Sequence, residues 1–473
     1  MRLIAGLDVG TTGCKVTVFS SAGDCLGREY RDYPVRRAAE AQEIDAQALS
    51  ASVRDCVRAA KARFGAIDSM GVTSFGEAFV LLDAKGCPLR PILLCTDARG
   101  KEECRAFCER FGEERAAKIS GVKPSESYSF PKLMWIKAHE PDIYAQARSV
   151  MLVEDYVIFL LTGERTIDYS LAARTAAFDI GRLEWSDEIL HAAGLEPTWF
   201  SKVVPTGAVA GVDADGTKIV AGGHDQVACA VGAGVFAPGT AAEGAGTVEC
   251  MTPVFAAAPE TTQFQRDNYC VVPYFGNYVC YAYSYTGGEL LRWCKEAICR
   301  RDHLELQSGP YAGPTGLLVL PHFAGAATPY MDSGSRGAIV GLSLVTTDRD
   351  IYLACMEAVA YEMRINRERL ASSGVVIDRL VATGGGAKSK LWMQIKADVL
   401  GLELDTLETE DAGTVGCAMM AGVAAGVFAD LAAARSAMVR KTGSFVPNPE
   451  RQLEYDKVYQ RYKKLYAAIR PLV

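Results

Sequence analysis

The sequence predicts an α/β fold in which two related domains each carry a mixed β-sheet flanked by helices. Three observations predict it. The chain opens as three short strands, a helix and a further strand, the second half repeats a strand, a Gly/Ala/Thr-rich turn and a strand at Gly239–Met251, and a long helix at Asp350–Leu370 separates the later strands. This internal echo suggests two domains with a cleft between them, and we place their boundary so that they span 1–233 and 234–473.

The opening elements follow from local patterns. Leu3–Leu7 is a short apolar run that stops at Asp8, and the chain then continues as a hairpin meander. Asp45 is the predicted N-cap of a helix, because apolar residues recur at helical spacing from there to Phe64. Ile67–Thr73 is a predicted buried strand.

The later elements are read in the same way. The segment from Lys101 to Gly163 is predicted to be mainly helical, and Tyr269–Tyr285 is a predicted hairpin with its turn at Gly276-Asn277. A strand at Leu380–Thr383, a glycine turn and a helix at Lys390–Leu400 follow.

Composition excludes several classes of function. The net charge is −7, with 50 Lys and Arg against 57 Asp and Glu and no basic stripe, so nucleic acid is not an expected partner. We expect a cytoplasmic protein with no membrane span, because the start is not a secretory signal and long uncharged apolar stretches are absent. The 15 scattered cysteines are predicted to be thiols, and the histidines lack zinc-ligand spacing.

A turn of small residues follows the first predicted strand, in the segment DVGTTGCK that runs from Asp8 to Lys15. Backbone N–H groups in such a turn can hold phosphate oxygens. Thr11 and Thr12 add hydroxyl donors, Gly13 permits close approach, and Lys15 could reach a phosphate. Asp8 would hold Mg²⁺ through water, because Mg²⁺ prefers to keep several waters. A plain β-hairpin with an exposed aspartate is the alternative.

A second acid stands where another predicted strand ends, in Gly222-Gly223-His224-Asp225-Gln226. Phosphoryl transfer to an alcohol needs in-line positioning, charge neutralisation and one group that accepts the hydroxyl proton. A carboxylate suits this task, because the proton leaves late, when the oxygen has become acidic. An aspartate at a strand-to-helix turn also often caps the helix, so both roles stay open for Asp225. His224 is expected to serve packing or a hydrogen bond.

Weaker signals complete the set. The turn from Gly384 to Ser389 could let a flat base lie against its glycines, or it is an ordinary β–α turn. Glu77 and Asp97 follow predicted strands, where α/β proteins bind ligands, and could pair with sugar hydroxyls at roughly 1.5–3 kcal/mol each. Alternatively they are solvated loop acids, with Arg99 neutralising Asp97. The segment after Glu410 starts a helix of small residues, and its signal for a binding site is no stronger than that of the turn from Gly384 to Ser389.

Together these segments resemble the FGGY carbohydrate kinases of the actin-like ATPase superfamily, and the resemblance runs through nearly the whole chain. DVGTTGCK resembles the first phosphate loop of the family, Ser127–Trp135 its N-terminal signature, and GGHDQ the segment with the catalytic aspartate. LPHFAGAATPYMD and Gly337–Glu357 resemble the C-terminal signature, and GGGAKSKLWMQIKADVLG resembles the adenosine segment.

The resemblance implies two ribonuclease H-like domains that close on ATP and substrate, with a catalytic cleft between them. The first domain would bind the sugar and carry the first phosphate loop, and the second would bind the nucleotide. Asp225 would be the general base and Asp8 the Mg²⁺-associated acid. The residues expected near ATP are Thr11, Thr12, Gly13, Lys15, Gly244, Gly325, Gly385 and Ser389. The residues expected at the sugar are Glu77, Asp97 and Gln226.

The implied reaction is ATP-dependent phosphorylation of a small sugar or polyol. A ketopentose such as xylulose is favoured, because the length and the LPHFAGAATPYMD segment look closer to xylulokinases than to glycerol kinases. Glycerol, gluconate, ribulose, fuculose and a tetritol are the alternatives. The expected partners are the sugar and ATP, with no nucleic acid and no membrane, and a homodimer is an option.

Two departures bear on this hypothesis. The second phosphate loop of the family usually reads GTG or GTS, whereas here Gly244-Ala245-Gly246 precedes Thr247. Gly76-Glu77 matches neither the Met-His-Gly of typical xylulokinases nor the Arg-Glu of glycerol kinases. The rival classes are a non-catalytic actin-like ATPase and a sugar-binding regulator without turnover.

Overall fold

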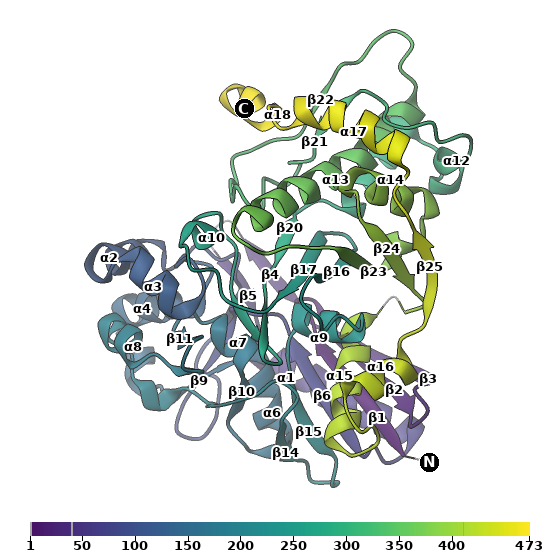
Figure 1. Cartoon of the computed structure of the whole chain (residues 1–473). Coiled ribbons are helices and arrows are strands. Elements are labelled where there is room, and N and C mark those ends of the chain that lie inside the picture. Colours follow the sequence, from purple (N-terminus) through teal and green to yellow (C-terminus); the bar gives the residue numbers. More distant parts are fainter. Residues whose placement is uncertain (1, 39–40, 410) are drawn as a thin grey trace. The chain divides into compact units, whose positions relative to one another are not determined.

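The computed structural model describes residues 2–38, 41–409 and 411–473, which form two compact units. Unit 1 comprises Met1–Gly234, Cys270–Val279 and Asp411–Val439, and unit 2 comprises Val235–Tyr269, Cys280–Glu410 and Arg440–Val473. Each unit has a mixed sheet with helices packed on it (Figure 1). The predicted α/β fold with two mixed sheets is therefore confirmed.

The sheet of unit 1 has the strand order β14-β15-β6-β1-β2-β3. Its strands are β1 (Leu3–Val9), β2 (Gly13–Ser20), β3 (Cys25–Asp32), β6 (Ser69–Ser74), β14 (Val209–Val212) and β15 (Lys218–His224). β6 runs parallel to both β1 and β15, with Ser74 opposite Val9 on one side and His224 on the other. The carboxyl ends of these three strands therefore meet at one edge of the sheet.

The two faces of this sheet are covered differently. On one face, Leu7 and Val72 belong to a core shared with α1 (Ala46–Phe64) and α6 (Val153–Thr162). On the other, α15 (Ala412–Ala424) packs on β1, β6 and α9 (Asp225–Gly232). A Cβ at Gly6 or Gly71 would collide with a backbone carbonyl of α15. The glycines thus let α15 lie directly on the sheet.

Smaller elements complete unit 1. The short strands are β4 (Val35–Ala38), β5 (Ala41–Ile44), β7 (Phe79–Leu82), β8 (Ile92–Leu93), β9 (Ser149–Leu152), β10 (Thr166–Asp168), β11 (Phe178–Asp179), β12 (Glu184–Trp185), β13 (Lys202–Val204), β18 (Val272–Tyr274) and β19 (Asn277–Val279). The other helices are α2 (Lys101–Phe111), α3 (Glu113–Ser120), α4 (Ser129–His139), α5 (Pro141–Gln146), α7 (Tyr169–Ala173), α8 (Asp187–Ala193), η1 (Pro197–Trp199) and α16 (Leu431–Met438).

Unit 2 repeats the topology of unit 1. Its sheet runs β25-β24-β23-β16-β17, with β20 beside β17, and in it β23 runs parallel to β16 and β24 while the other pairs are antiparallel. The strands are β16 (Thr240–Ala245), β17 (Glu249–Phe255), β20 (Ala282–Ser284), β23 (Arg379–Thr383), β24 (Glu403–Leu407) and β25 (Lys441–Phe445). The echo seen in the sequence is thus a repeated sheet.

The remaining elements of unit 2 are mostly helical. They are α10 (Gln263–Arg266), α11 (Gly288–Trp293), the π-helix η2 (Cys294–Cys299), α12 (His303–Gln307), α13 (Asp348–Ser372), η3 (Gly385–Lys388), α14 (Lys390–Leu400), α17 (Pro449–Tyr462), α18 (Leu465–Ile469) and η4 (Arg470–Leu472), with the strands β21 (Leu318–Leu320) and β22 (Ala338–Val340).

A buried ion cluster lies in the core of unit 2. The ammonium of Lys396 on α14 lies 3.0 Å from a carboxylate oxygen of Glu243 on β16 and 2.6 Å from one of Glu249 on β17. All three side chains are fully buried. The two acids flank the turn of residues 246–248, so this cluster ties α14 to the base of that turn.

Several local predictions are confirmed and one is wrong. The carboxylate of Asp45 accepts the N–H groups of Gln47 and Ala48 at the start of α1. The hairpin turn, however, lies at Phe275-Gly276, because Tyr274 pairs with Asn277. Both turn residues have positive φ angles, of 44° and 77°. None of the 15 cysteines forms a disulfide.

Within the described ranges, the structure contains no helix with the length and apolar character that a membrane crossing requires.

Candidate active site

Three predicted site residues of unit 1 lie at the shared carboxyl edge of its sheet. Asp8 is the penultimate residue of β1, Glu77 follows β6 by three residues, and Asp225 directly follows β15. Since Val9, Ser74 and His224 stand opposite one another in the register, the three acids come from adjacent strand ends.

The turn after β1 is tightly closed. The N–H of Gly10 donates to the carbonyl of Gly13 at 2.9 Å, and the hydroxyl of Tyr33 donates to the carbonyl of Gly10. A Cβ at Gly13 would collide with Tyr30. Thr11 is half-buried and Thr12 exposed. The segment is a hairpin turn, and its role in binding phosphate stays a prediction.

Lys15 on β2 joins two acids. Its ammonium lies 3.1 Å from a carboxylate oxygen of Asp8 and 2.9 Å from one of Asp411. Burial and the charge of Asp411 raise the pKa of Asp8, although Lys15 opposes the shift. Asp411 was not among the predicted site residues, because the sequence shows only a helix start at that point, and only the packing of α15 on the sheet brings it here.

Asp225 is the first residue of α9, but it does not cap the helix. The cap is His224, whose Nδ1 accepts the N–H of Gln226 at 3.3 Å. This geometry contradicts the capping alternative for Asp225. The predicted hydrogen-bonding role of His224 is confirmed, and burial together with the charge of Arg174 lowers the pKa of its ring.

The carboxyl group of Asp225 has an unusual environment. Its side chain is partly exposed, but its Oδ1 is buried and lies 3.1 Å from Nδ1 of His224. Because that nitrogen already accepts a backbone N–H, it gives an ionised carboxylate no proton. Burial and the charge of Asp8 raise the pKa of Asp225 to about 7, against the lowering effect of the N–H of Gln226. The group therefore exchanges its proton near neutral pH, as a general base should.

Glu77 is held by an arginine that the sequence analysis missed. Nε of Arg174 donates to Oε1 of Glu77 at 2.6 Å, and Nη2 of Arg174 donates to the same oxygen. Glu77 adopts φ 63°, and its carbonyl accepts the hydroxyl of Ser129 at 2.6 Å. A Cβ at Gly76 would lie 2.7 Å from the ring of His224. Glu77 is therefore a buried acid held in place beside the loop of Asp225. The alternative in which it is a solvated loop acid is wrong.

Asp97 forms a separate cluster. Arg99 donates to both of its oxygens, at 2.8 and 2.7 Å, and the N–H of Gln42 donates to it at 2.9 Å. Burial opposes ionisation, but these donors hold the pKa of Asp97 below its usual value. The alternative in which Arg99 neutralises Asp97 is thus what the structure shows. Gln226, half-buried on α9, and Asp97 keep their proposed contact with the sugar as a prediction.

The predicted nucleotide residues of unit 2 fall into two regions. A Cβ at Gly384 would lie 2.8 Å from the carbonyl oxygen of Ala245, which follows Gly244, so the loops of Gly244 and Gly385 pack together. Ser389 caps α14 and donates its hydroxyl to Gln307 at 2.7 Å. Gly325 lies in a different turn, with φ 91°.

The loop that departs from the family pattern is well packed. Ala245 is fully buried, whereas Thr247 is exposed. The backbone carbonyl of Thr247 accepts the N–H groups of Gly287 and Glu289 at 2.9 and 3.3 Å. Thr247 is thus the exposed hydroxyl-bearing residue of this loop.

Asp8 and Asp411, the two acids that contact Lys15, could hold a magnesium ion if water molecules supplied most of its other ligands. Among the described residues there is no group of three or more His, Cys, Asp or Glu side chains that could hold a metal. Mg²⁺ needs only one or two carboxylates when waters and phosphates supply the remaining ligands. The pKa of Asp8 is raised by burial and by Asp411, and that of Asp225 is raised in part by Asp8, so a further cation would be favoured here. Asp8 and Asp411 therefore fit a magnesium ion that keeps most of its water ligands.

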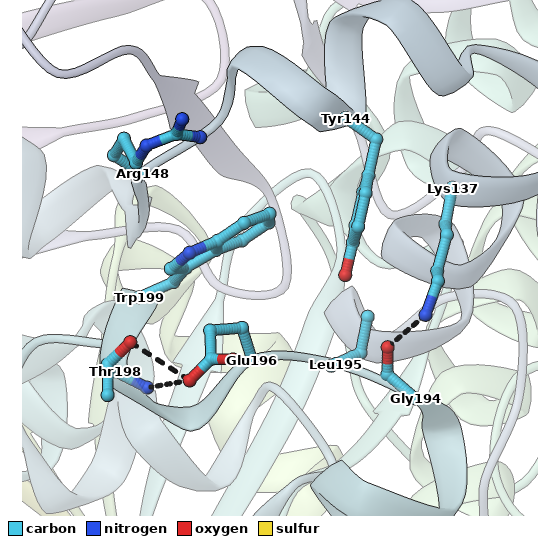
Figure 2. Close-up of a pocket in the computed structure, with 8 residues that line it drawn as sticks. All are labelled: Lys137, Tyr144, Arg148, Gly194, Leu195, Glu196, Thr198 and Trp199. Atoms are coloured by element: carbon cyan, nitrogen blue, oxygen red, sulfur yellow. Dashed lines mark hydrogen bonds between the residues drawn. The ribbon is translucent and has the colours of Figure 1, made fainter.

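Another hollow of unit 1 lies apart from these residues (Figure 2). It has a volume of about 640 Å³, and the rings of Tyr144 and Trp199 stand 4.9 Å apart in it. Its lining residues are Lys137, Tyr144, Arg148, Gly194, Leu195, Glu196, Thr198 and Trp199. None of the predicted site residues lines it.

The fold and the matches of two long segments to family models define this chain as a sugar kinase. Residues 3–234 match the model of the N-terminal domain of the FGGY family of carbohydrate kinases, and residues 260–425 match that of its C-terminal domain. The chain belongs to the FGGY family of carbohydrate kinases, which are phosphotransferases.

Individual relatives cover the whole chain. A xylulose kinase of Bacillus subtilis is 27% identical, with 100% of this chain and 98% of the relative covered. An autoinducer-2 kinase of Enterobacter sp. is 29% identical, covering 99% of this chain and 94% of the relative. The crystal structure of a xylulose kinase from Rhodospirillum rubrum superposes with a TM-score of 0.90 at 25% identity, covering 100% and 99% of the two chains.

Proposed function

We propose that Asp225 is the general base with which this carbohydrate kinase transfers the γ-phosphoryl group of ATP to a hydroxyl of a small sugar or polyol. The observation that carries the proposal is the position of Asp225. It stands at the sheet edge beside Asp8, and its pKa is raised to about 7 by burial and by that neighbour. A base with this pKa is about half ionised at pH 7, and its ionised form is basic enough to take a proton.

The proposed reaction assigns one task to each group. The hydroxyl oxygen attacks the γ-phosphorus, its proton passes to a carboxylate oxygen of Asp225, and the bond from that phosphorus to the ADP oxygen breaks. Thr11, Thr12, Gly13 and Lys15 would hold phosphate oxygens. Asp8, with Asp411, would hold Mg²⁺, which when bound neutralises charge on the phosphates.

The other assignments concern binding. Glu77, Asp97 and Gln226 would bind the hydroxyls of the sugar. Gly244, Gly325, Gly385 and Ser389 would contact the nucleotide. We also propose that residues 1–233 act as the sugar-binding domain and residues 234–473 as the nucleotide-binding domain.

We propose a ketopentose such as xylulose as the substrate. The support is that xylulose kinases stand among the relatives that cover the whole chain. Autoinducer-2 kinases match with similar identity, and Gly76-Glu77 departs from the xylulokinase pattern, so the substrate needs a direct test.

A sugar panel provides that test. ADP formation is measured with xylulose, ribulose, fuculose, gluconate, glycerol and a tetritol, and a thermal-shift assay with an ATP analogue reports binding, because a ligand of the native state raises its apparent stability. We expect turnover that depends on the sugar and a kcat/KM that is highest for xylulose. A higher kcat/KM for another substrate would replace xylulose. Binding without turnover would indicate a regulator, and sugar-independent hydrolysis an actin-like ATPase.

The pKa of Asp225 predicts an acidic limb in the pH profile. Below pH 7 the carboxyl is protonated in the free enzyme and cannot take the hydroxyl proton, so kcat/KM for the sugar should fall about tenfold per pH unit there. Above pH 7 the group is ionised and this limb should level off. Initial rates between about pH 5.5 and 9 measure it, since kcat/KM reports the free enzyme. A profile that is flat down to pH 5.5 would contradict the assignment.

A further inference from the structure

The residue two positions before Asp225 is held by side chains on both sides of its backbone. The pairing of β15 with β6 shifts register between Ala221 and Gly223. The N–H of Gly223 donates to Oε1 of Glu154 at 2.6 Å, and its carbonyl accepts the hydroxyl of Thr73 at 2.6 Å. Two buried side chains therefore fix this backbone at the point where the chain leaves the sheet.

Gly223 fits this place closely. Its φ is 85°, and an added Cβ would lie 2.6 Å from Oγ of Ser170 and 3.0 Å from Oδ2 of Asp168. Ser170 also accepts the N–H of His224 at 2.9 Å through its hydroxyl. The two residues that precede Asp225 are thus bonded to side chains from β6, α6 and α7.

Glu154 is the acid at the centre of this network. It lies in the first turn of α6, is 0% exposed, and its Oε2 accepts the N–H of Asp168 at 3.3 Å. Asp168 in turn caps α7 and accepts the hydroxyl of Thr206 at 2.5 Å. Burying an acid costs free energy unless its oxygens are well bonded. Both oxygens of Glu154 accept backbone N–H groups, and one of these belongs to Gly223 at the end of β15.

The next residue supplies a natural comparison. Asp155 is 1% exposed and lies in the same turn of α6, but its Oδ2 accepts the hydroxyl of Ser201 at 2.6 Å. It makes none of the bonds to the strand end. The two acids thus differ in what they hold, while their burial is the same.

We propose that Glu154 and Thr73 are positioning residues that hold Gly223, and through it aim the carboxylate of Asp225 at the substrate hydroxyl. This inference rests on the proposed role of Asp225. A displacement of about 1 Å in a catalytic group can lower a rate by about 100-fold. The rate of the chemical step therefore depends on how firmly the backbone from Gly223 to Asp225 is held.

Two pairs of variants test the inference. Thr73→Val removes the hydroxyl and keeps the shape, whereas Thr73→Ser keeps the hydroxyl. Glu154→Gln keeps one acceptor but turns an amide toward the second backbone N–H, and Asp155→Asn is its control in the same turn. Each purified variant is assayed for kcat, for KM of ATP and sugar, for the pH profile of kcat/KM, and for its thermal unfolding.

We expect Thr73→Val and Glu154→Gln to lower kcat by about 10–100-fold, with KM for ATP nearly unchanged and the acidic limb moved away from pH 7. Thr73→Ser and Asp155→Asn should stay within about threefold of the parent. If the two test variants fold and turn over like their controls, the positioning role is wrong. That failure is separate from a failure of the base, which an active Asp225→Asn variant would reveal. If Glu154→Gln does not fold, the Thr73 pair decides.

Discussion

Asp225→Asn is expected to lower kcat by about 10²–10⁴-fold, the usual contribution of a general base, while ATP still binds. The amide keeps the shape of the side chain but cannot accept the hydroxyl proton as a carboxylate does. Steady-state kinetics with the preferred sugar measures kcat, and a fluorescent ATP analogue measures binding. A kcat near that of the parent enzyme would contradict the base assignment.

The stability of the same variant separates catalysis from misfolding. The fold raises the pKa of Asp225 above its unfolded value, so the ionised group opposes folding. This effect is absent at pH values below the unfolded pKa, grows as the pH rises and is complete above about pH 7. Asp225→Asn should therefore raise Tm at pH 8 and leave it nearly unchanged near pH 4. An inactive variant with a lowered Tm at pH 8 would indicate a structural role.

Lys396→Met is expected to reduce the stability of unit 2 by about 3–5 kcal/mol, because removing one partner of a buried ion pair leaves uncompensated charge in the core. Lys396 is the cation that holds Glu243 and Glu249 together, at 3.0 and 2.6 Å. The methionine fills a similar volume without a charge. Urea unfolding followed by tryptophan fluorescence measures the loss, since Trp392 lies against the ammonium at 4.3 Å.

Two further variants control this measurement. Lys390→Met on the same helix removes an exposed ammonium and should change stability by less than about 0.5 kcal/mol. Adding Glu249→Gln to Lys396→Met should recover part of the loss, because it removes one of the stranded acids. Equal stabilities for Lys390→Met and Lys396→Met would show that the cluster does not stabilise the core.

Local signals in the sequence were sufficient for most of the elements. Asp45 caps α1 as its position before a helical apolar pattern predicts, because a cap depends on residues two and three positions away. The repeated strand-turn-strand pattern predicted two mixed sheets, because it too depends on residues that are close in the chain. The hairpin turn shifted by one residue because Phe275 adopts a positive φ, which a non-glycine residue rarely does.

The partners of the site residues could not be predicted in this way. Arg174 and Glu77 are 97 positions apart in the chain, and Lys15 meets Asp411 only because α15 packs on the sheet. The role of Glu154 depends on the register shift at Gly223, which no composition or spacing reveals. Sequence motifs were sufficient to select candidate acids for the site. Tertiary packing decides which cation or backbone group each acid contacts.

The most direct test of the account is the fate of the γ-phosphorus during turnover. With ATP, Mg²⁺ and the preferred sugar, ³¹P NMR and ADP measurement should give one sugar phosphomonoester for each ADP formed, and Asp225→Asn should form both far more slowly. ADP formed together with inorganic phosphate, at the same rate with and without any sugar of the panel, would contradict phosphoryl transfer to an alcohol by this site.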